Sequence, residues 1–264
     1  MPKVSVIMGA YNEEKTLQAA VDSILAQTYT DWEFVICDDA STDATFKILT
    51  DYKNKYPDKF VILHNDENMM LAGSLNKCLE NAKGEYIARM DADDISLPTR
   101  LEKEIKYLDD NPNCAVVGTN VQFFNDKDGL GEIIRKTPDP TIYDIPKANP
   151  FFHPTIVMRK SAYNALNGYT AEERTRRMED IEMWYRFFHK GFTGHNINET
   201  LLYYRVDKNA LKKRKLKYSI DASRIVFDGI RLLNLPLKYY VYSLKPIVSQ
   251  MLPESFKSFA RKHK

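Results

Sequence analysis

Residues 84–94 read GEYIARMDADD, an apolar run that ends in a cluster of acidic residues. The run from Glu85 to Met90 has the length and composition of a buried strand. Residues two apart in an extended chain point the same way, so Asp91 and Asp93 are predicted to converge on one site where this strand ends.

Three earlier segments repeat the pattern of an apolar strand, and apolar residues at helical spacing separate them. Tyr11, Asn12 and Glu13 follow the first strand, and Asp38 and Asp39 follow the second. Alternation of strands and helices predicts βαβ units and an α/β fold with a mostly parallel mixed sheet flanked by helices. The carboxyl ends of such strands meet at one edge, where these folds bind ligands. The three strands are Val4–Met8, Glu33–Cys37 and Phe60–Leu63.

The sequence also carries signals for where the intervening helices begin and end. Asn12 is expected to cap the first helix, and residues 41–43, Ser-Thr-Asp, to open the second. Gly84 is expected to stop the third helix, which carries Leu71 to Ala82. Pro98 is expected in the first turn of the fourth.

The second half of the chain has a looser pattern. Thr155–Met158 and Leu201–Tyr204 are predicted to be strands, and Glu179–Lys190 is predicted to be a helix with an apolar inner face. Polar, glycine-bearing or proline-rich composition predicts loops over Asn125–Gly131 and Pro138–Pro150.

The composition indicates an intracellular, folded enzyme. The chain has 264 residues, 44% of them hydrophobic, which is enough for one large core. Cys37, Cys78 and Cys114 lie far apart, which argues against a disulfide framework or a zinc site and fits a reducing compartment. The first apolar run is too short for a secretory signal, and no run reaches the roughly 18 apolar residues of a membrane span.

The charge is distributed unevenly along the chain. Residues 208–264 carry 14 Lys and Arg against 3 Asp and Glu, a net charge of +11, whereas the rest of the chain carries −9. Short basic segments with apolar and aromatic side chains typically lie in a membrane interface, so contact with an anionic membrane surface is expected. The alternative is a helical appendage packed on the core. Nucleic acid is not expected as a partner, because no recognition motif accompanies the basic run.

The acidic clusters favour a metal site over a glycine-rich phosphate loop. Residues 9–12, Gly-Ala-Tyr-Asn, do not form a G-x-G-x-x-G turn, and the chain has no G-x-x-x-x-G-K-[ST] loop. Carboxylates repel phosphate unless a cation lies between them. Asp91 and Asp93 offer the hard oxygen ligands that suit Mg²⁺ or Mn²⁺, which keep positions open for diphosphate oxygens. Alternatively, these aspartates cap the next helix or lie in solvent, and Asp94 in particular fits a cap or a supporting residue.

Several blocks in a fixed order resemble the family 2 glycosyltransferases, which have the GT-A nucleotide-diphospho-sugar transferase fold and invert the anomeric centre. The resemblance spans Pro2 to about Val206. The matching blocks are VSVIM at 4–8 with Tyr11-Asn12, DDASTD at 38–43, GEYIARMDADD at 84–94, LPTRL at 97–101, EDIEMW at 179–184 and LYYRV at 202–206.

This resemblance implies an inverting hexosyltransferase that moves a sugar from a nucleotide sugar, a UDP-sugar by preference, to an acceptor hydroxyl. The implied setting is cell-surface polysaccharide or lipid-linked oligosaccharide synthesis, with a saccharide or lipid-linked saccharide acceptor. The enzyme would be cytoplasmic and peripheral on the inner face of the cell membrane. Residues 1–207 would form the GT-A domain, with 1–110 as its nucleotide-binding half and 114–207 as its acceptor half. Residues 208–264 would form a basic amphipathic helical tail.

The matching positions also imply roles in nucleotide binding. Tyr11 would pack against the base, with the backbone near Gly9 and Ala10 and the Glu13 side chain lining the same pocket. Asp39 would accept a hydrogen bond from the base, which favours uracil with its N3–H donor.

Further positions would hold the metal and the reacting groups. Asp91 would lie near the ribose and the metal, Asp93 would ligate the Mn²⁺ or Mg²⁺, and Asp180 would be the catalytic base. The chain departs from the family at Asn68–Met70, where a glycine is common, and at Asp207, which stands where a histidine often reaches the metal.

Residue spacing leaves other interpretations open. Asp180 is equally placed to cap the helix that begins there, Trp184 has the spacing of a core residue, and His153 fits a buried structural histidine as well as an acceptor pocket. A sugar-1-phosphate nucleotidyltransferase is one alternative enzyme, but its usual Gly-rich basic loop is replaced here by residues 11–14, Tyr-Asn-Glu-Glu. A non-catalytic scaffold that binds nucleotide or lipid is another, and the intact aspartates argue against it.

Overall fold

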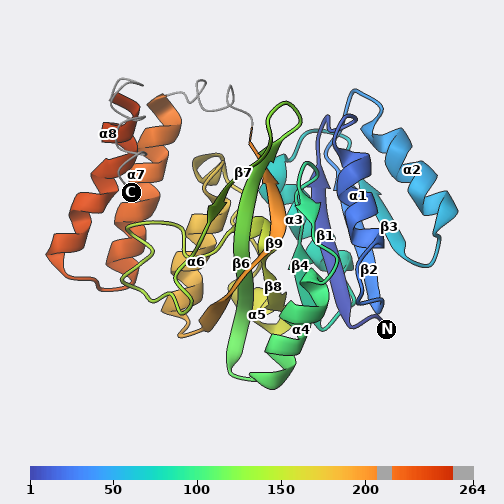
Figure 1. Cartoon of the computed structure of the whole chain (residues 1–264). Helices are drawn as coiled ribbons and strands as arrows, with labels where there is room; N and C mark the ends of the chain where they lie inside the picture. Colours follow the sequence, from blue (N-terminus) through green and yellow to red (C-terminus); the bar gives the residue numbers. More distant parts are fainter. Residues whose placement is uncertain (207–215, 252–264) are drawn as a thin grey trace.

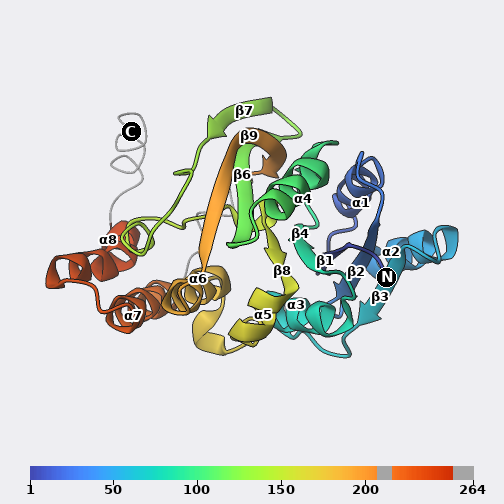
Figure 2. The ribbon, with the colours of Figure 1, turned by 90° about the horizontal axis from the view of Figure 1, so that it is seen from below.

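Figure 1 and Figure 2 show a computed structural model in which helices cover both faces of one mixed sheet. It describes residues 1–206 and 216–251. Asp207 and the basic run at residues 212–215 therefore lie outside the described residues, as do Phe256 and Phe259.

The first half of the chain forms the predicted parallel βαβ units. Its four strands pair in the order β3-β2-β1-β4, and each pair is parallel. The elements are β1 (Val4–Ala10), α1 (Leu17–Leu25), β2 (Trp32–Asp38), α2 (Thr45–Lys55), β3 (Phe60–His64), α3 (Met70–Asn81) and β4 (Tyr86–Arg89).

The second half continues the same sheet with antiparallel pairs, as the mixed-sheet prediction requires. Strand β8 joins β4 to β6, β7 forms a hairpin with β6, and β9 runs parallel to β6. Its elements are β5 (Ile95–Ser96), α4 (Arg100–Asp110), β6 (Cys114–Asn125), β7 (Gly129–Ile134), η1 (His153–Thr155), β8 (Val157–Arg159), α5 (Lys160–Leu166), η2 (Glu173–Thr175), α6 (Glu179–His189) and β9 (Thr193–Arg205).

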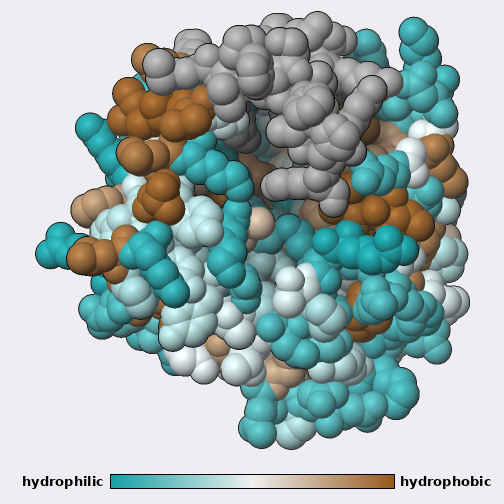
Figure 3. All heavy atoms as spheres, turned by 60° about the vertical axis from the view of Figure 1, so that its left-hand side comes forward, coloured by the Kyte–Doolittle hydropathy of each residue, from teal (hydrophilic) through white to brown (hydrophobic). Residues whose placement is uncertain are grey.

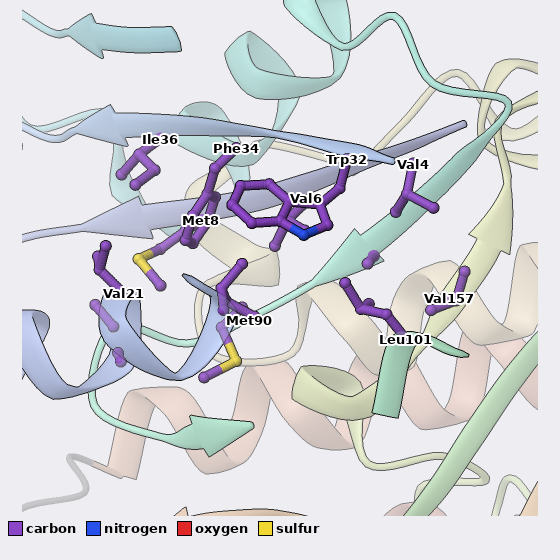
Figure 4. Packing of buried hydrophobic residues seen from close by; sticks show 14 of the residues in the cluster. Val4, Val6, Met8, Val21, Trp32, Phe34, Ile36, Met90, Leu101 and Val157 are labelled. Carbon is purple, nitrogen blue, oxygen red and sulfur yellow. The ribbon is translucent and has the colours of Figure 1, made fainter. Parts of the chain in front are cut away.

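The core lies on both faces of the sheet, because alternate residues of each strand point to opposite sides. Val4, Val6 and Met8 of β1 face α1, α2 and α4, and Figure 4 shows Val6 and Met8 beside Phe34 and Val4 beside Trp32. Ile7 of the same strand faces α3, α5 and α6. Each fully buried side chain of this size stabilises the fold by about 1.5–3 kcal/mol.

Three predicted helix boundaries are wrong. Asn12 does not cap α1, which begins at Leu17; its backbone is left-handed (φ 56°), and its Oδ1 accepts a hydrogen bond from Thr42 N at 2.8 Å. Pro98 precedes α4, which begins at Arg100. Both residues instead shape loops at the edge of the sheet. Such polar side chains satisfy loop backbone as readily as helix ends, so the local pattern does not separate the two uses.

Gly84 does not end α3 directly, because the helix stops at Asn81. A Cβ at Gly84 would lie 2.4 Å from Ser5 N, so the glycine permits the chain to pass against β1. The backbone N of Gly84 also donates to Ser5 Oγ at 2.8 Å. Gly84 therefore sets the position from which β4, and the acidic cluster after it, departs.

The described residues of the C-terminal tail pack on the core. They form α7 (Leu216–Leu232), η4 (Leu237–Leu244) and α8 (Lys245–Met251). A Cβ at Gly229 of α7 would lie 2.3 Å from Cγ of Tyr185 in α6, so the two helices meet at this glycine. Among the residues described, no helix has the length and apolar character needed to cross a bilayer.

Candidate functional site

The carboxyl ends of β1, β2 and β4 enclose a cavity of about 310 Å³, here called the carboxylate cavity. Backbone hydrogen bonds hold the three ends in register: Asp39 N donates to Ala10 O at 2.8 Å, and Met90 N donates to Ile7 O at 3.1 Å. The cavity is lined by Gly9, Ala10, Tyr11, Glu13, Asp39, Leu71, Ser74, Asp91, Ala92, Asp93 and Tyr204. The structure thus brings every predicted nucleotide and metal residue to one space.

The acidic residues after β4 converge. One carboxylate oxygen from each of Asp91, Asp93 and Asp94 lies within 4.8 Å of the others. Burial, together with the charges of Asp91 and Glu13, raises the pKa of Asp93 to about 7. Burial and the carboxylates of Asp91 and Asp93 raise the pKa of Asp94 well above its ordinary value. Each of these two carboxyls is therefore destabilised as an anion, the condition that a bound divalent cation relieves.

Asp94 is a member of this cluster and is not a helix cap, because α4 begins six residues later and Ile95 starts β5. Asp94 is almost fully buried, and its Oδ1 accepts a hydrogen bond from Arg205 N at 2.8 Å. Its Oδ2 is buried without a hydrogen-bond partner among the described residues. The sequence pattern around Asp94 indicates only a cap or a supporting role.

Two arginines hold the acidic loop, and one of them pairs with its charge. Arg89 is buried, and its Nη1 lies 2.5 Å from Asp91 Oδ2. Burial lowers the pKa of Arg89, but the charge and hydrogen bond of Asp91 together raise it above its ordinary value. Arg205 donates from Nε to Asp93 O at 2.8 Å. The Arg205 guanidinium forms its ion pair with Asp126 Oδ2 at 2.6 Å, outside the cluster. Arg89 is thus the arginine that pairs with a group of four carboxylates, Glu13 included, and the excess of negative charge suits Mg²⁺ or Mn²⁺.

A fully buried arginine on α4 supports the acidic loop from beneath. Arg100 Nη2 donates to Arg89 O at 2.7 Å, directly before the acidic cluster. Arg100 Nε also pairs with Glu104 Oε2 at 3.1 Å. The loop that carries Asp91 and Asp93 is thereby tied to α4.

Asp39 is held in a single orientation. Its Oδ1 accepts hydrogen bonds from Asn65 Nδ2 and Met69 N, both at 2.8 Å. The Met69 contact comes from the loop where the family commonly has a glycine, so this loop closes on Asp39 in spite of the difference. Tyr11 beside it is half-exposed and presents its ring to the cavity wall.

Glu13 serves the loop as well as the cavity. Its backbone N donates to Thr45 Oγ1 at 2.8 Å, and its Oε2 accepts from Thr16 Oγ1 at 2.7 Å. Burial, with added repulsion from Asp91, raises its pKa. The side chain is therefore close enough to the acidic cluster to contribute to its charge.

Left-handed backbone gathers around this site. Six non-glycine residues in the described chain have positive φ. Asn12 and Ala40 flank the carboxylate cavity, and Met70 and Arg177 line a second cavity beside it. Such conformations cost about 1–3 kcal/mol each and persist where the surrounding structure enforces them, often at functional sites.

A second cavity of about 330 Å³, here called the arginine cavity, adjoins the first and shares Tyr11, Asp39 and Leu71 with it. Arg176 and Arg177 line its far wall, and both guanidinium groups lie within 6 Å of the Tyr218 ring of α7. The tail therefore contacts the segment that lines the arginine cavity.

Asp180 lies in the first turn of α6 and lines neither cavity, although its neighbour Glu179 lines the arginine cavity. Its Oδ1 accepts from Ile181 N at 2.8 Å, and Asn149 Nδ2 donates to its Oδ2. Burial raises the pKa of Asp180, and these two donors and Arg89 oppose that effect. Asp180 is the second residue of α6, and its bond to the next residue is not a helix cap, because Met178 precedes the helix and makes no side-chain cap. The Asn149 contact needs the tertiary fold.

His153 and Trp184 belong to the core. Trp184 is fully buried, as its helical spacing suggested. His153 is also buried, its Nε2 lies 2.8 Å from Tyr169 Oη, and burial holds its pKa well below the ordinary value. This environment supports the interpretation of His153 as a buried structural histidine.

Comparison with known proteins is consistent with this geometry. The family model of glycosyl transferase family 2 matches residues 5–166. The chain is 47% identical to the glycosyltransferase EpsE of Bacillus subtilis over 96% of this chain and 90% of that protein. It is 28% identical, over 94% of this chain and 95% of the relative, to WfaP of Escherichia coli, named a UDP-Glc:alpha-D-GlcNAc-diphosphoundecaprenol beta-1,3-glucosyltransferase.

Solved structures show the same fold. Staphylococcus aureus TarS 1–349 with UDP-GlcNAc has a TM-score of 0.70 at 20% identity, over 93% of this chain and 70% of that one. The mannosyltransferase PcManGT of Pyrobaculum calidifontis, in complex with GDP-Man and Mn²⁺, has a TM-score of 0.64 at 20% identity, over 94% and 68% of the two chains. The GT-A fold expected from the sequence is confirmed.

Proposed function

The chain belongs to glycosyltransferase family 2, and we propose that it transfers a sugar from a UDP-sugar to a saccharide hydroxyl with inversion of the anomeric centre. The observation that carries this proposal is the carboxylate cavity, where Tyr11, Asp39, Asp91 and Asp93 line one space. An aromatic surface for a base, a fixed acceptor and ligands for a cation are the features that a nucleotide sugar needs.

Uracil is the base that best suits Asp39. The two donors on its Oδ1 fix the orientation of the carboxylate and hence the position of its other oxygen. An ionised carboxylate is acceptor-only, and it therefore suits the N3–H donor of uracil. Tyr11 would pack against the base, with Ala10 and Glu13 on the same wall.

The residues present suit a divalent cation. Asp91 and Asp93 would hold Mn²⁺ or Mg²⁺, with Asp94 close enough to ligate or orient. When bound, the ion would stabilise the charge that develops on the departing diphosphate. Arg89 and Arg205 would keep the acidic loop in place whether or not the cation is there.

Asp180 is the proposed catalytic base. Donors to both of its oxygens favour the carboxylate, which is the form that accepts a proton. Asp180 would take the proton of the acceptor hydroxyl as the hydroxyl oxygen attacks the anomeric carbon and the diphosphate leaves. A single displacement inverts the configuration and requires no covalent nucleophile.

The proposed acceptor is a saccharide or lipid-linked saccharide in polysaccharide synthesis at the inner face of the cell membrane. The WfaP relative is named for an acceptor sugar on diphosphoundecaprenol. The proposed domains are residues 1–207 as the transferase, with 1–110 on the donor side and 114–207 on the acceptor side, and residues 208–264 as the tail.

The tail offers a surface suited to a membrane. Leu237, Val241, Leu244 and Val248 of η4 and α8 are each at least 50% exposed, and this set is here called the apolar tail surface. Figure 3, which brings this side forward, shows hydrophobic side chains beside hydrophilic ones on its left. Apolar side chains with interspersed lysines bind anionic interfaces by burial and by charge.

The donor assignment is tested by thermal stabilisation with a panel of UDP- and GDP-sugars, with and without Mn²⁺. A ligand at 100 times its Kd should add about 2.7 kcal/mol to stability. Stabilisation by UDP-sugars that needs Mn²⁺ supports the proposal, and stabilisation by GDP-sugars alone would overturn the uracil assignment.

The type of reaction is tested by the product released. Release of UDP on adding an acceptor extract separates a transferase from a scaffold. Release of pyrophosphate from UTP and a sugar 1-phosphate would identify a nucleotidyltransferase.

The membrane assignment is tested by co-sedimentation with neutral and anionic vesicles. We expect stronger recovery with anionic vesicles and a loss of recovery in a Leu237→Ser, Val241→Ser double variant. Leu130→Ser, which changes an exposed leucine of β7, is the matched control. Equal recovery with both vesicle types would remove the electrostatic component of the assignment.

A further inference from the structure

A third cavity lies on the acceptor side of Asp180. It has a volume of about 720 Å³ and lies between β7 and residues 135–150, and it is here called the lysine cavity. None of the residues assigned above to donor or metal binding lines it. Its walls combine apolar groups such as Ile134 and Pro150 with Arg135, Lys136 and Lys147.

Lys136 is a half-buried cation without a counter-ion. Its Nζ donates to Asn149 O at 2.5 Å and lies 4.3 Å from the centre of the Phe152 ring. No described carboxylate lies within ion-pairing distance of it. Burial lowers its pKa to about 8, and the charge of Asp180 partly opposes this. A cation that has lost water without gaining an anion is destabilised, and a bound anion would relieve this cost.

The remaining charges of the lysine cavity leave it cationic. Glu132 and Asp144 are its two acidic residues. Both carboxylate oxygens of Asp144 already have partners within the protein. Its Oδ2 accepts hydrogen bonds from Thr141 N at 2.9 Å and from Thr141 Oγ1 at 2.7 Å, and Lys147 Nζ lies 3.4 Å from its Oδ1. Arg135 is exposed and forms no ion pair with a described residue, so its charge is free to meet an anion.

Asn149 connects the lysine cavity to the base. Its backbone oxygen accepts from Lys136, and its side chain donates to Asp180 Oδ2. Because Asn149 contacts both residues, a ligand with its anionic group at Lys136 places its adjoining sugar close to the proposed catalytic base.

The tail forms the outer support of the same cavity. Lys245 Nζ of α8 donates to Lys147 O at 2.7 Å, and the rings of Tyr143 and Tyr239 lie 5.8 Å apart. The apolar tail surface begins at Leu237, two residues from Tyr239. An anion site and an apolar surface are thus joined through one packed segment.

We propose that the lysine cavity binds the phosphate of the acceptor, so that the acceptor is a phosphate-bearing saccharide whose phosphate meets Lys136 and Arg135. This deepens the proposed function and rests on it for the identity of the acceptor. Two sources share this chemistry: a saccharide joined to a lipid through diphosphate, and a lipid-free sugar phosphate.

The test is binding in EDTA, where the carboxylate cavity repels phosphate. Calorimetry would use N-acetylglucosamine 1-phosphate and a short-chain polyprenyl diphosphate as probes. Lys136→Gln should weaken binding at least 10-fold, because a hydrogen bond to a charged group is worth about 1.5–3 kcal/mol. Lys136→Arg should keep most of it. Lys106→Gln, which changes an exposed lysine of α4, is the control and should bind as the wild type does.

If Lys136→Gln does not fold, Arg135→Gln serves in its place, because its side chain is exposed. Unchanged binding in a folded Lys136→Gln protein, or an equal loss in Lys106→Gln, would overturn the proposal. Tighter binding of the polyprenyl probe indicates the lipid-linked source, and equal affinity indicates the lipid-free one. Stabilisation by UDP and Mn²⁺, measured separately, reports on the proposed function, so the two failures are distinguishable.

Discussion

Asn149 donates a side-chain hydrogen bond to Asp180 across 31 positions of the chain. With the Ile181 N–H on the other oxygen, it holds the carboxylate in one orientation at the start of α6. This contact joins the acceptor-side segment to the proposed base, and it separates two roles that can be tested independently.

The proposed role of Asp180 is tested by Asp180→Asn. We expect transfer to fall by about 10²–10⁴-fold, since the amide cannot take the proton of the acceptor hydroxyl. Stabilisation by UDP and Mn²⁺ should stay at the wild-type level, because Asp180 lines neither donor-side cavity. UDP release and thermal melting measure the two effects, and weak donor binding in a folded variant would refute the assignment.

Asn149→Ala should move the pH dependence of transfer. The Asn149 donor lowers the pKa of Asp180, so its loss raises that pKa further above the ordinary value. The base is then protonated at higher pH, and the acid limb of kcat against pH shifts upward. Asn81→Ala, on the exposed side of α3, is the control. An acid limb at the wild-type pH would show that this contact does not tune the base.

Asp93→Asn should have opposite effects without and with metal. Three carboxylates within 4.8 Å repel one another when no cation is bound, so the variant should melt higher than the wild type in EDTA. With UDP and Mn²⁺ the wild type should gain about 5–10 °C and the variant little. Asp110→Asn, at the exposed end of α4, is the control. A wild-type rise in the melting temperature of Asp93→Asn on adding UDP and Mn²⁺ would exclude Asp93 as a metal ligand.

Gly229→Ala should weaken the packing of α7 on α6. The added Cβ would lie 2.3 Å from Tyr185 Cγ, so the helices must separate, at a cost of about 1–3 kcal/mol. Thermal melting would report the loss, and a second change, Tyr185→Leu, should recover some of it. Arg231→Ala, at an exposed position of the same helix, should leave the melting temperature unchanged. Equal melting of Gly229→Ala and wild type would contradict this packing.

Glu104→Gln should alter the pH dependence of stability. Burial raises the pKa of Glu104 to about 8 against an ordinary 4.5, even with Arg100 beside it. The folded protein thus holds this proton more tightly than the unfolded chain, and the associated stability is lost as pH rises from about 5 to about 8. Gln does not titrate, so the stability of the variant relative to that of the wild type should rise between about pH 5.5 and about pH 8.5.

Urea unfolding at about pH 5.5 and about pH 8.5 measures the difference in stability between the Glu104→Gln variant and the wild type. Glu102→Gln, on the same helix but exposed, is the control and should show no pH-dependent gain. A constant difference between Glu104→Gln and wild type would mean that Glu104 keeps an ordinary pKa.

The order of strands and helices in the first half of the chain could be predicted because each depends on residues close together. In the second half the prediction of a loop over Asn125–Gly131 was wrong at both ends, which belong to β6 and β7. Val4, Val6 and Met8 alternate with polar or opposite-facing residues in any strand, and this periodicity is visible without neighbours. The placement of Asp39, Asp91 and Asp93 follows from the same local rule, since each follows a strand closely. Local signals were less reliable at helix ends, as Asn12 and Gly84 demonstrate.

Strand period and ordered motifs are properties of contiguous residues, so the parallel half of the sheet, the acidic strand ends and the family could all be inferred from the order of amino acids. Folding in three dimensions was needed to show that Asp94 joins Asp91 and Asp93, that Arg205 donates hydrogen bonds to their loop, and that Asn149 and Lys136 meet near Asp180. Most of these contacts join segments dozens of residues apart. Their energy depends on burial and on charges that come together when the chain is folded, which no local pattern records.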